Sequence, residues 1–70
     1  MEPTKRFARN LKIERKSREI SQEALAAKAN VHRTEISLLE RGGRDPRLST
    51  IVRLARALEV PPSCLLEDVH

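Results

Sequence analysis

Polar side chains recur at helical spacing in residues 32–41, HRTEISLLER. Arg33 carries a planar guanidinium whose parallel donors match the O6 and N7 acceptors of guanine. Thr34 adds a hydroxyl and a methyl group, and Ser37 lies one helical turn beyond on the same side. The major groove of B-DNA admits an α-helix and displays a different pattern of donors, acceptors and methyl groups for each base pair. These three residues are therefore candidates to read DNA bases.

Three further side chains of the same segment have alternative roles. His32 stands where a helix would begin, so a neutral imidazole there can accept a backbone amide or contact a phosphate. Leu38 can meet a thymine methyl group or complete the core. Glu35 can accept from cytosine N4, but phosphates repel it, and we expect it to cap the start of the helix instead. His32 and Leu38 join the base-reading candidates.

The element that must position these residues is predicted over residues 21–42 as two short helices joined by a tight turn. Ser21 is a favourable N-cap for the first, because its hydroxyl can accept an unpaired amide of the first turn. Asn30 tolerates the left-handed backbone that commonly ends a helix. The buried positions follow helical spacing, and Gly42 and Gly43 end the second helix. Those positions are Leu25, Ala26, Ala29, Ile36 and Leu39. The pattern is a helix-turn-helix.

Three more helices are predicted around this motif, over residues 4–18, 48–58 and 62–67. Thr4 can cap the first of them, and proline opens the last. The inward faces are expected to hold Phe7, Ala8 and Leu11 in the first helix, and Leu48, Ile51, Leu54, Ala55 and Leu58 in the helix over 48–58. No stretch alternates as a strand would. The fold class is therefore all-α with five helices, in a single domain over residues 1–70.

A chain of 70 residues supports only a small hydrophobic core. Such a domain rarely gains more than about 3 to 5 kcal/mol from its core alone. Dimerisation is therefore expected, through the segment 60–68. Val60, Leu65 and Leu66 exceed the needs of the core and are the candidate interface residues.

The formal net charge of +4 suits a polyanionic partner. Basic residues crowd the first quarter and return from Arg33 onward, whereas the tail is acidic. For the first helix alone, two interpretations are equally supported: its cations only keep the helix surface hydrated, or they bind the polyanionic partner. A membrane-surface helix is disfavoured, because Phe7 and Leu11 make a thin apolar face and the core needs both.

Enzyme, metal and cofactor functions are disfavoured by the residue pattern. No carboxylate pair, activated nucleophile or glycine-rich phosphate loop is recognisable. His32, Cys64 and His70 lack any metal-ligand spacing. The single cysteine forms no internal bridge, and neither a secretory leader nor a membrane span is recognisable, so a cytoplasmic location is expected.

The joint spacing of residues 7–66 resembles the helix-turn-helix domain of phage-repressor and Cro-like transcriptional regulators. Within that family, the segment HRTEISLLERG looks most like small restriction-modification controller proteins. Glu14, Glu19 and Asn30 depart from the family pattern, which often has an apolar residue at the first position and glycine at the other two. The matching residues are Leu11, Arg15, Ser21, Gln22, Leu25, Ala26, Ala29, Val31, Ile36, Ser37, Glu40, Arg41, Gly42, Pro46, Leu54, Ala55, Ala57, Leu58, Val60, Leu65 and Leu66.

The resemblance implies roles for several residues. Gln22 occupies the family's position for a phosphate contact, and Arg47 is placed near the DNA backbone or the minor groove. Arg15 and Glu40 are implied to pair across two helices. Arg41 and Arg44 are further candidates for the DNA backbone, although a solvated loop charge is an equal alternative for Arg44.

The expected function is sequence-specific binding of double-stranded DNA by a homodimeric transcriptional regulator, without a cofactor. Its operator would be a palindrome with half-sites about 34 Å apart. A protein partner such as RNA polymerase is also expected. The alternative function is a protein-interaction module of the antitoxin type, in which the basic surface serves no DNA contact.

Overall fold

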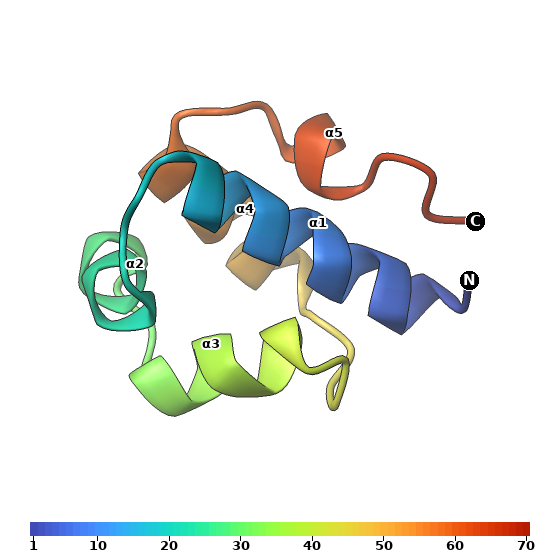
Figure 1. Cartoon of the computed structure of the whole chain (residues 1–70), viewed down its shortest axis with the longest axis horizontal. Helices are drawn as coiled ribbons and strands as arrows, with labels where there is room; N and C mark the ends of the chain where they lie inside the picture. Colours follow the sequence, from blue (N-terminus) through green and yellow to red (C-terminus); the bar gives the residue numbers. More distant parts are fainter.

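A computed structural model describes all residues, 1–70, and contains helices only (Figure 1). The predicted all-α fold with five helices is confirmed. In Figure 1, α3 runs along one edge of the molecule, α5 along the opposite edge, and α1 lies between them. The helices are α1 (Pro3–Ser17), α2 (Gln22–Ala29), α3 (Arg33–Glu40), α4 (Leu48–Leu58) and α5 (Pro62–Leu65). No helix combines the length and apolar character needed to cross a membrane.

One core joins all five helices. Its members include Leu11 of α1, Leu25 of α2 and Leu54 of α4, none of which has exposed surface. Phe7 is the only aromatic residue of the chain and is almost fully buried. Each fully buried leucine or phenylalanine contributes about 1.5–3 kcal/mol relative to an exposed one. The inward faces predicted for α1, α2 and α3 are thus confirmed.

The caps of α2 and α3 fix the geometry of the helix-turn-helix. Ser21 Oγ accepts from the amide of Ala24 at 3.0 Å, and Asn30 ends α2 in the left-handed region at φ 56° and ψ 47°. His32 Nδ1 accepts from the amide of Thr34 at 3.1 Å and so caps α3. Because each end is closed by a side chain or a favourable backbone conformation, the turn has one defined path.

The start of α1 differs from the prediction. The helix begins at Pro3, and Glu2 rather than Thr4 is its N-cap, with Glu2 Oε1 accepting from the amide of Thr4 at 3.1 Å. Hydrogen bonds from Thr4 lower the pKa of the Glu2 carboxyl. The Thr4 hydroxyl donates instead to Asp45 Oδ1 at 2.6 Å, which ties the start of α1 to the loop after α3.

The predicted apolar face of α4 is wrong at its first residue. Leu48 is 74% exposed, whereas Ile51, Leu54, Ala55 and Leu58 are buried as expected. Leu48 is the first residue of α4, directly after the N-cap, and its side chain lies outside the face on which Thr50 and Ile51 of the same turn are buried. The last helix is also shorter than predicted, because it ends at Leu65 and not at residue 67.

Candidate nucleic-acid interface

The outward face of α3 carries the predicted base-reading residues. His32, Arg33 and Thr34 are exposed at the start of the helix, and Ser37 is half-buried one turn later. The opposite face holds Ile36 and Leu39, which have no exposed surface. Because the buried face packs on the core, the polar face is directed away from it along the edge shown in Figure 1. The predicted convergence of these residues on one face is therefore present in the structure.

The donors of Arg33 are free. No hydrogen bond or ion pair within the chain involves its guanidinium, and the hydroxyls of Thr34 and Ser37 also have no partner in the chain. His32 differs, because its Nδ1 is occupied by the amide of Thr34. An imidazole that accepts through Nδ1 carries its proton on Nε2, which leaves one outward donor.

Leu38 was considered either for the core or for contact with a thymine methyl group, and its position is intermediate. It is half-buried and does not belong to the core cluster. Its carbonyl accepts from the amide of Gly43 at 3.0 Å, and its side chain covers that glycine, since a Cβ added to Gly43 would lie 3.7 Å from Leu38 Cδ2. Leu38 therefore borders the outward face of α3 without being part of the core.

A buried ion pair braces α3 against α1. Arg15 Nε and Nη2 donate to the two carboxylate oxygens of Glu40 at 2.6 and 2.9 Å, and Arg15 Nη1 donates to the carbonyl of Ile20 at 2.9 Å. The Glu40 side chain is only 2% exposed. Its hydrogen bonds raise the pKa of Arg15 above the usual value. The pairing implied by the family resemblance is confirmed, and it fixes the end of α3.

Gln22 belongs to the same network. Its Nε2 donates to Glu40 Oε1 at 3.0 Å, and the side chain is half-buried at the start of α2. A carboxamide nitrogen carries two hydrogens, so the bond to Glu40 leaves one donor. The phosphate contact expected of Gln22 would therefore be made by a side chain that Glu40 already orients.

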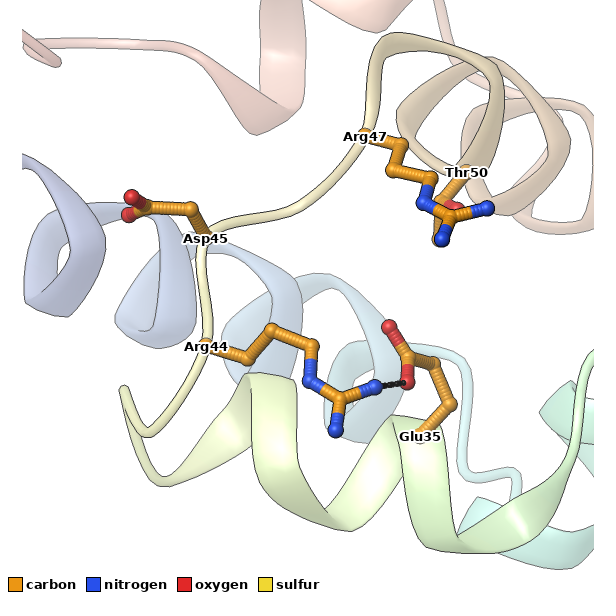
Figure 2. Close-up of a pocket in the computed structure, with 5 residues that line it drawn as sticks. All are labelled: Glu35, Arg44, Asp45, Arg47 and Thr50. Carbon is orange, nitrogen blue, oxygen red and sulfur yellow. Dashed lines mark hydrogen bonds and ion pairs between the residues drawn. The ribbon is translucent and has the colours of Figure 1, made fainter.

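A polar cavity of about 500 Å³ flanks α3 on the side of α4 (Figure 2). Arg44 reaches across from the loop after α3 and pairs with Glu35, while Arg47 extends from the start of α4 on the opposite side. The expected capping role of Glu35 is wrong, because His32 caps α3 and the Glu35 carboxylate instead binds Arg44. Asp45 points away from this pair toward α1.

The candidates for contacts to the DNA backbone therefore differ in whether their side chains are free to bind a phosphate. Arg41 and Arg47 are exposed and form no ion pair or hydrogen bond through their side chains. Arg44 is exposed but paired with Glu35, so it is neither a free donor nor a simply solvated loop charge.

The sequence profile of the helix-turn-helix family HTH_3 matches residues 11–63. The chain belongs to the helix-turn-helix family. This is a family of DNA-binding transcriptional regulators and not of enzymes, and the matched residues contain α2, α3 and the turn between them. The helix-turn-helix predicted from residues 21–42 is thereby confirmed.

Control proteins are among the relatives of this helix-turn-helix chain. Control protein C.BamHI of Bacillus amyloliquefaciens is 46% identical over 48 residues, which are 69% of this chain and 59% of that protein. Control protein C.SmaI of Serratia marcescens is 40% identical over 60 residues, which are 86% of this chain and 71% of that protein. The match thus spans less than two thirds of C.BamHI.

A solved structure agrees with this kinship. The restriction-modification controller protein C.AhdI from Aeromonas hydrophila superimposes with a TM-score of 0.87 at 34% sequence identity, covering 89% of this chain and 94% of that chain. The similarity to controller proteins indicated by HRTEISLLERG is therefore confirmed.

The three residues predicted at a dimer interface of this helix-turn-helix domain differ in exposure. Leu65 was expected at a dimer interface, but it has no exposed surface and belongs to the core, so that prediction is wrong. The core needs Leu65 because α5 is short and this leucine is its one buried residue. Val60 is half-buried against the core, and Leu66 is 39% exposed.

Two buried polar residues were not predicted. Asn10 of α1 is 6% exposed, and its Nδ2 donates to the carbonyls of Leu65 and Glu67 at 3.0 and 2.8 Å. Its spacing of three residues from Phe7 was a signal of a buried position. Thr50 of α4 is 9% exposed and lines the cavity beside Arg47, and its spacing of four residues from Leu54 was a signal of the same kind.

Proposed function

We propose that the chain is a restriction-modification controller protein that binds a palindromic operator as a homodimer and reads it with α3. The observation that carries this proposal is the outward face of α3, whose donors are free while its other face is held by the core and by the Arg15–Glu40 pair. A recognition helix needs free donors and a fixed position, because a few hydrogen bonds can discriminate between bases only when the helix is held rigidly.

The proposed base contacts come from the first turns of α3. Arg33 would donate two parallel bonds to a guanine, and Thr34 and Ser37 would bond base edges or a thymine methyl group. His32 would donate through Nε2, since its Nδ1 caps the helix. Leu38, at the border of this face, would meet a thymine methyl group.

The proposed backbone contacts flank this face on both sides. Gln22 lies on one side, next to Glu40, and Arg47 lies on the other, beside the polar cavity. Arg41 and Arg44 follow α3 at its end. Contacts to phosphate set the register of α3 on the duplex without carrying sequence information.

A dimer is proposed because one copy is too small to reach two half-sites. The chain measures 28 × 22 × 21 Å, whereas half-sites one helical turn apart are separated by about 34 Å. Two copies related by a two-fold axis would each place one α3 in the groove. Leu66 and Val60 remain the proposed interface residues, and RNA polymerase remains a proposed protein partner.

Selection of bound fragments from random-sequence DNA tests this function. We expect enrichment of an inverted repeat whose half-site centres lie about 10 base pairs apart. Arg33→Ala should weaken binding of the selected site by about 1–3 kcal/mol and change binding of random DNA little. Lys28→Ala is the matched control, because Lys28 is an exposed cation of α2 that lies beside Arg18 and Glu59 and outside the α3 face. Absence of any enriched sequence would overturn the proposal and favour a protein-interaction module.

A further inference from the structure

One face of α1 carries cations that have no partner within the chain. Lys5, Arg9 and Lys12 are exposed and follow each other at steps of four and three residues, which places them on one side of the helix. None of them forms an ion pair or a side-chain hydrogen bond. The other arginines of this helix and its C-cap behave differently, since Arg6 pairs with Asp68, Arg15 with Glu40 and Arg18 with Glu14.

This face lies beside the end of α3. Lys5, Arg9 and Lys12 line an open groove of about 290 Å³ together with Glu40 and Arg41. Gly42, two residues after the end of α3, lies close to Lys5, since a Cβ added to Gly42 would be 3.2 Å from Lys5 Cγ and 3.5 Å from Lys5 Cα. We call the set Lys5, Arg9, Lys12 and Arg41 the α1 basic stripe.

The stripe is on the same side of α3 as the Gln22 side chain. Glu40 lines the groove of the stripe and also accepts the hydrogen bond from Gln22. Arg44 and Arg47 line the cavity on the other side of α3, together with Glu35. The outward face of α3 is therefore bordered by cations on both sides. On the side where Gln22 lies, these cations are the residues of the α1 basic stripe.

The charge of the stripe is not balanced locally. Glu40 is the one acidic residue in the groove, and its oxygens are already engaged by Arg15 and Gln22. Four exposed cations thus line a groove whose one carboxylate is already engaged. Such a surface attracts a polyanion, and binding releases the counterions that the polyanion holds.

We propose that the α1 basic stripe binds DNA phosphates on the Gln22 side of the bases read by α3. This inference rests on the proposed DNA binding and adds a second row of backbone contacts to it. Lys5 and Lys12 are separated by about 10 Å along the helix axis, and a DNA strand carries one charge per about 3.4 Å of axis, so the stripe spans more than one phosphate. Its contribution is to affinity and salt dependence, not to sequence discrimination.

The test compares two double variants of the full chain. R9Q/K12Q removes two stripe charges, and K28Q/R56Q removes two exposed cations of α2 and α4 that lie outside the stripe. Gln resembles Lys and Arg in helix propensity, so both variants should keep their helices, which circular dichroism verifies. Affinity is measured for the selected operator and for a random duplex across a range of salt concentrations.

For R9Q/K12Q we expect about tenfold or greater weakening on both DNAs. The slope of log affinity against log salt should fall by about two for each bound subunit, and therefore by about four for the proposed dimer. K28Q/R56Q should leave the slope nearly unchanged. If wild-type protein binds its operator and R9Q/K12Q binds equally well, the inference is overturned while the proposed function stands.

Two other results would also refute the inference. An equal loss in K28Q/R56Q would show that only net charge matters. A loss confined to the selected operator would mean that the stripe reads bases. If the wild-type protein binds neither DNA, the proposed function itself fails, and the inference fails with it.

Discussion

Glu40 of α3 accepts three hydrogen bonds from side chains of two other helices. Arg15 supplies two of the donors from α1, and Gln22 supplies the third from α2. A carboxylate with 2% of its side chain exposed has lost most of its hydration, and these donors replace that hydration. The same acid thus holds α3 and orients a side chain proposed to contact a phosphate.

Glu40→Ala should lower the free energy of unfolding by about 3 kcal/mol, because it leaves the largely buried Arg15 guanidinium without its partner. In a domain of this size, thermal denaturation should show a fall in Tm of more than about 10 °C. Glu14→Ala is the control, since the exposed Glu14–Arg18 pair contributes about 0.5 kcal/mol or less. Equal melting of Glu40→Ala and wild type would refute the stabilising role of the pair.

Glu35→Gln should release Arg44 from its ion pair beside α3. An unpaired Arg44 can neutralise one more phosphate, so affinity for random DNA should rise by about three- to tenfold, as measured by fluorescence anisotropy. This expectation presumes the proposed DNA binding. The gain should vanish when Arg44→Gln is added, and persistence of the gain in that double variant would mean that Glu35 acts only as a repelling charge.

At the scale of the element, α5 is held by the core through Leu65 and by hydrogen bonds from α1. It has four residues and buries one of them, so its own hydrogen bonds cannot hold it in place. Asn10 of α1 donates to the carbonyls of Leu65 and Glu67, and Arg6 of α1 donates to the carbonyl of Glu67 and pairs with Asp68. Polar side chains of the first helix therefore tie down the C-terminal segment beside the buried Leu65.

Asn10→Ala should loosen α5 while α3 keeps its place. The substitution leaves the buried carbonyl of Leu65 without its side-chain donor, which costs about 1–3 kcal/mol. Hydrogen exchange should accelerate at the amides of Cys64 and Leu66, which bond within this segment, more than at amides of α3. Ser17→Ala serves as the control because Ser17 is exposed at the other end of α1. Uniform acceleration throughout the chain would contradict a local anchoring role.

At the scale of the whole molecule, the distribution of charge separates two surfaces. Free cations border the outward face of α3, whereas the surface around α5 combines Glu67 and Asp68 with the half-exposed Leu66. Asp68 is paired with Arg6, but Glu67 has no cationic partner, so phosphates would meet an uncompensated like charge at Glu67. That leaves the surface around α5 available for the dimer contact that we propose.

Leu66→Glu should shift the proposed dimer toward monomer. An introduced charge that loses its water in an apolar contact destabilises that contact, so sedimentation at tens of micromolar should show a smaller mean mass than for wild type. Leu48→Glu is a matched control, since Leu48 is an even more exposed leucine at the start of α4. A wild-type protein that sediments as a monomer would refute the dimer, and equal effects of both substitutions would refute the placement of the interface.

Local chemistry in the sequence was enough for the helices and for the helix-turn-helix. Ser21, Asn30 and Gly42 act through their own backbone and near neighbours, and the apolar spacing of α1 to α3 identified the faces that are buried. The outward set of Arg33, Thr34 and Ser37 followed from the same periodicity. The Arg15–Glu40 pair was foreseen through the family resemblance and not from periodicity.

The tertiary structure alone decided which of these residues remain available. Leu48 is exposed and Leu65 is buried because coverage depends on which helices lie nearby, and helical spacing carries no information about neighbours. Arg44 is bound to Glu35, and the stripe of Lys5, Arg9 and Lys12 meets Arg41, only because the fold brings these separate segments together. Residue types and spacing thus determined which donors and charges each helix carries. Packing between distant segments determined which of these charges are paired within the chain and which are free to bind a partner.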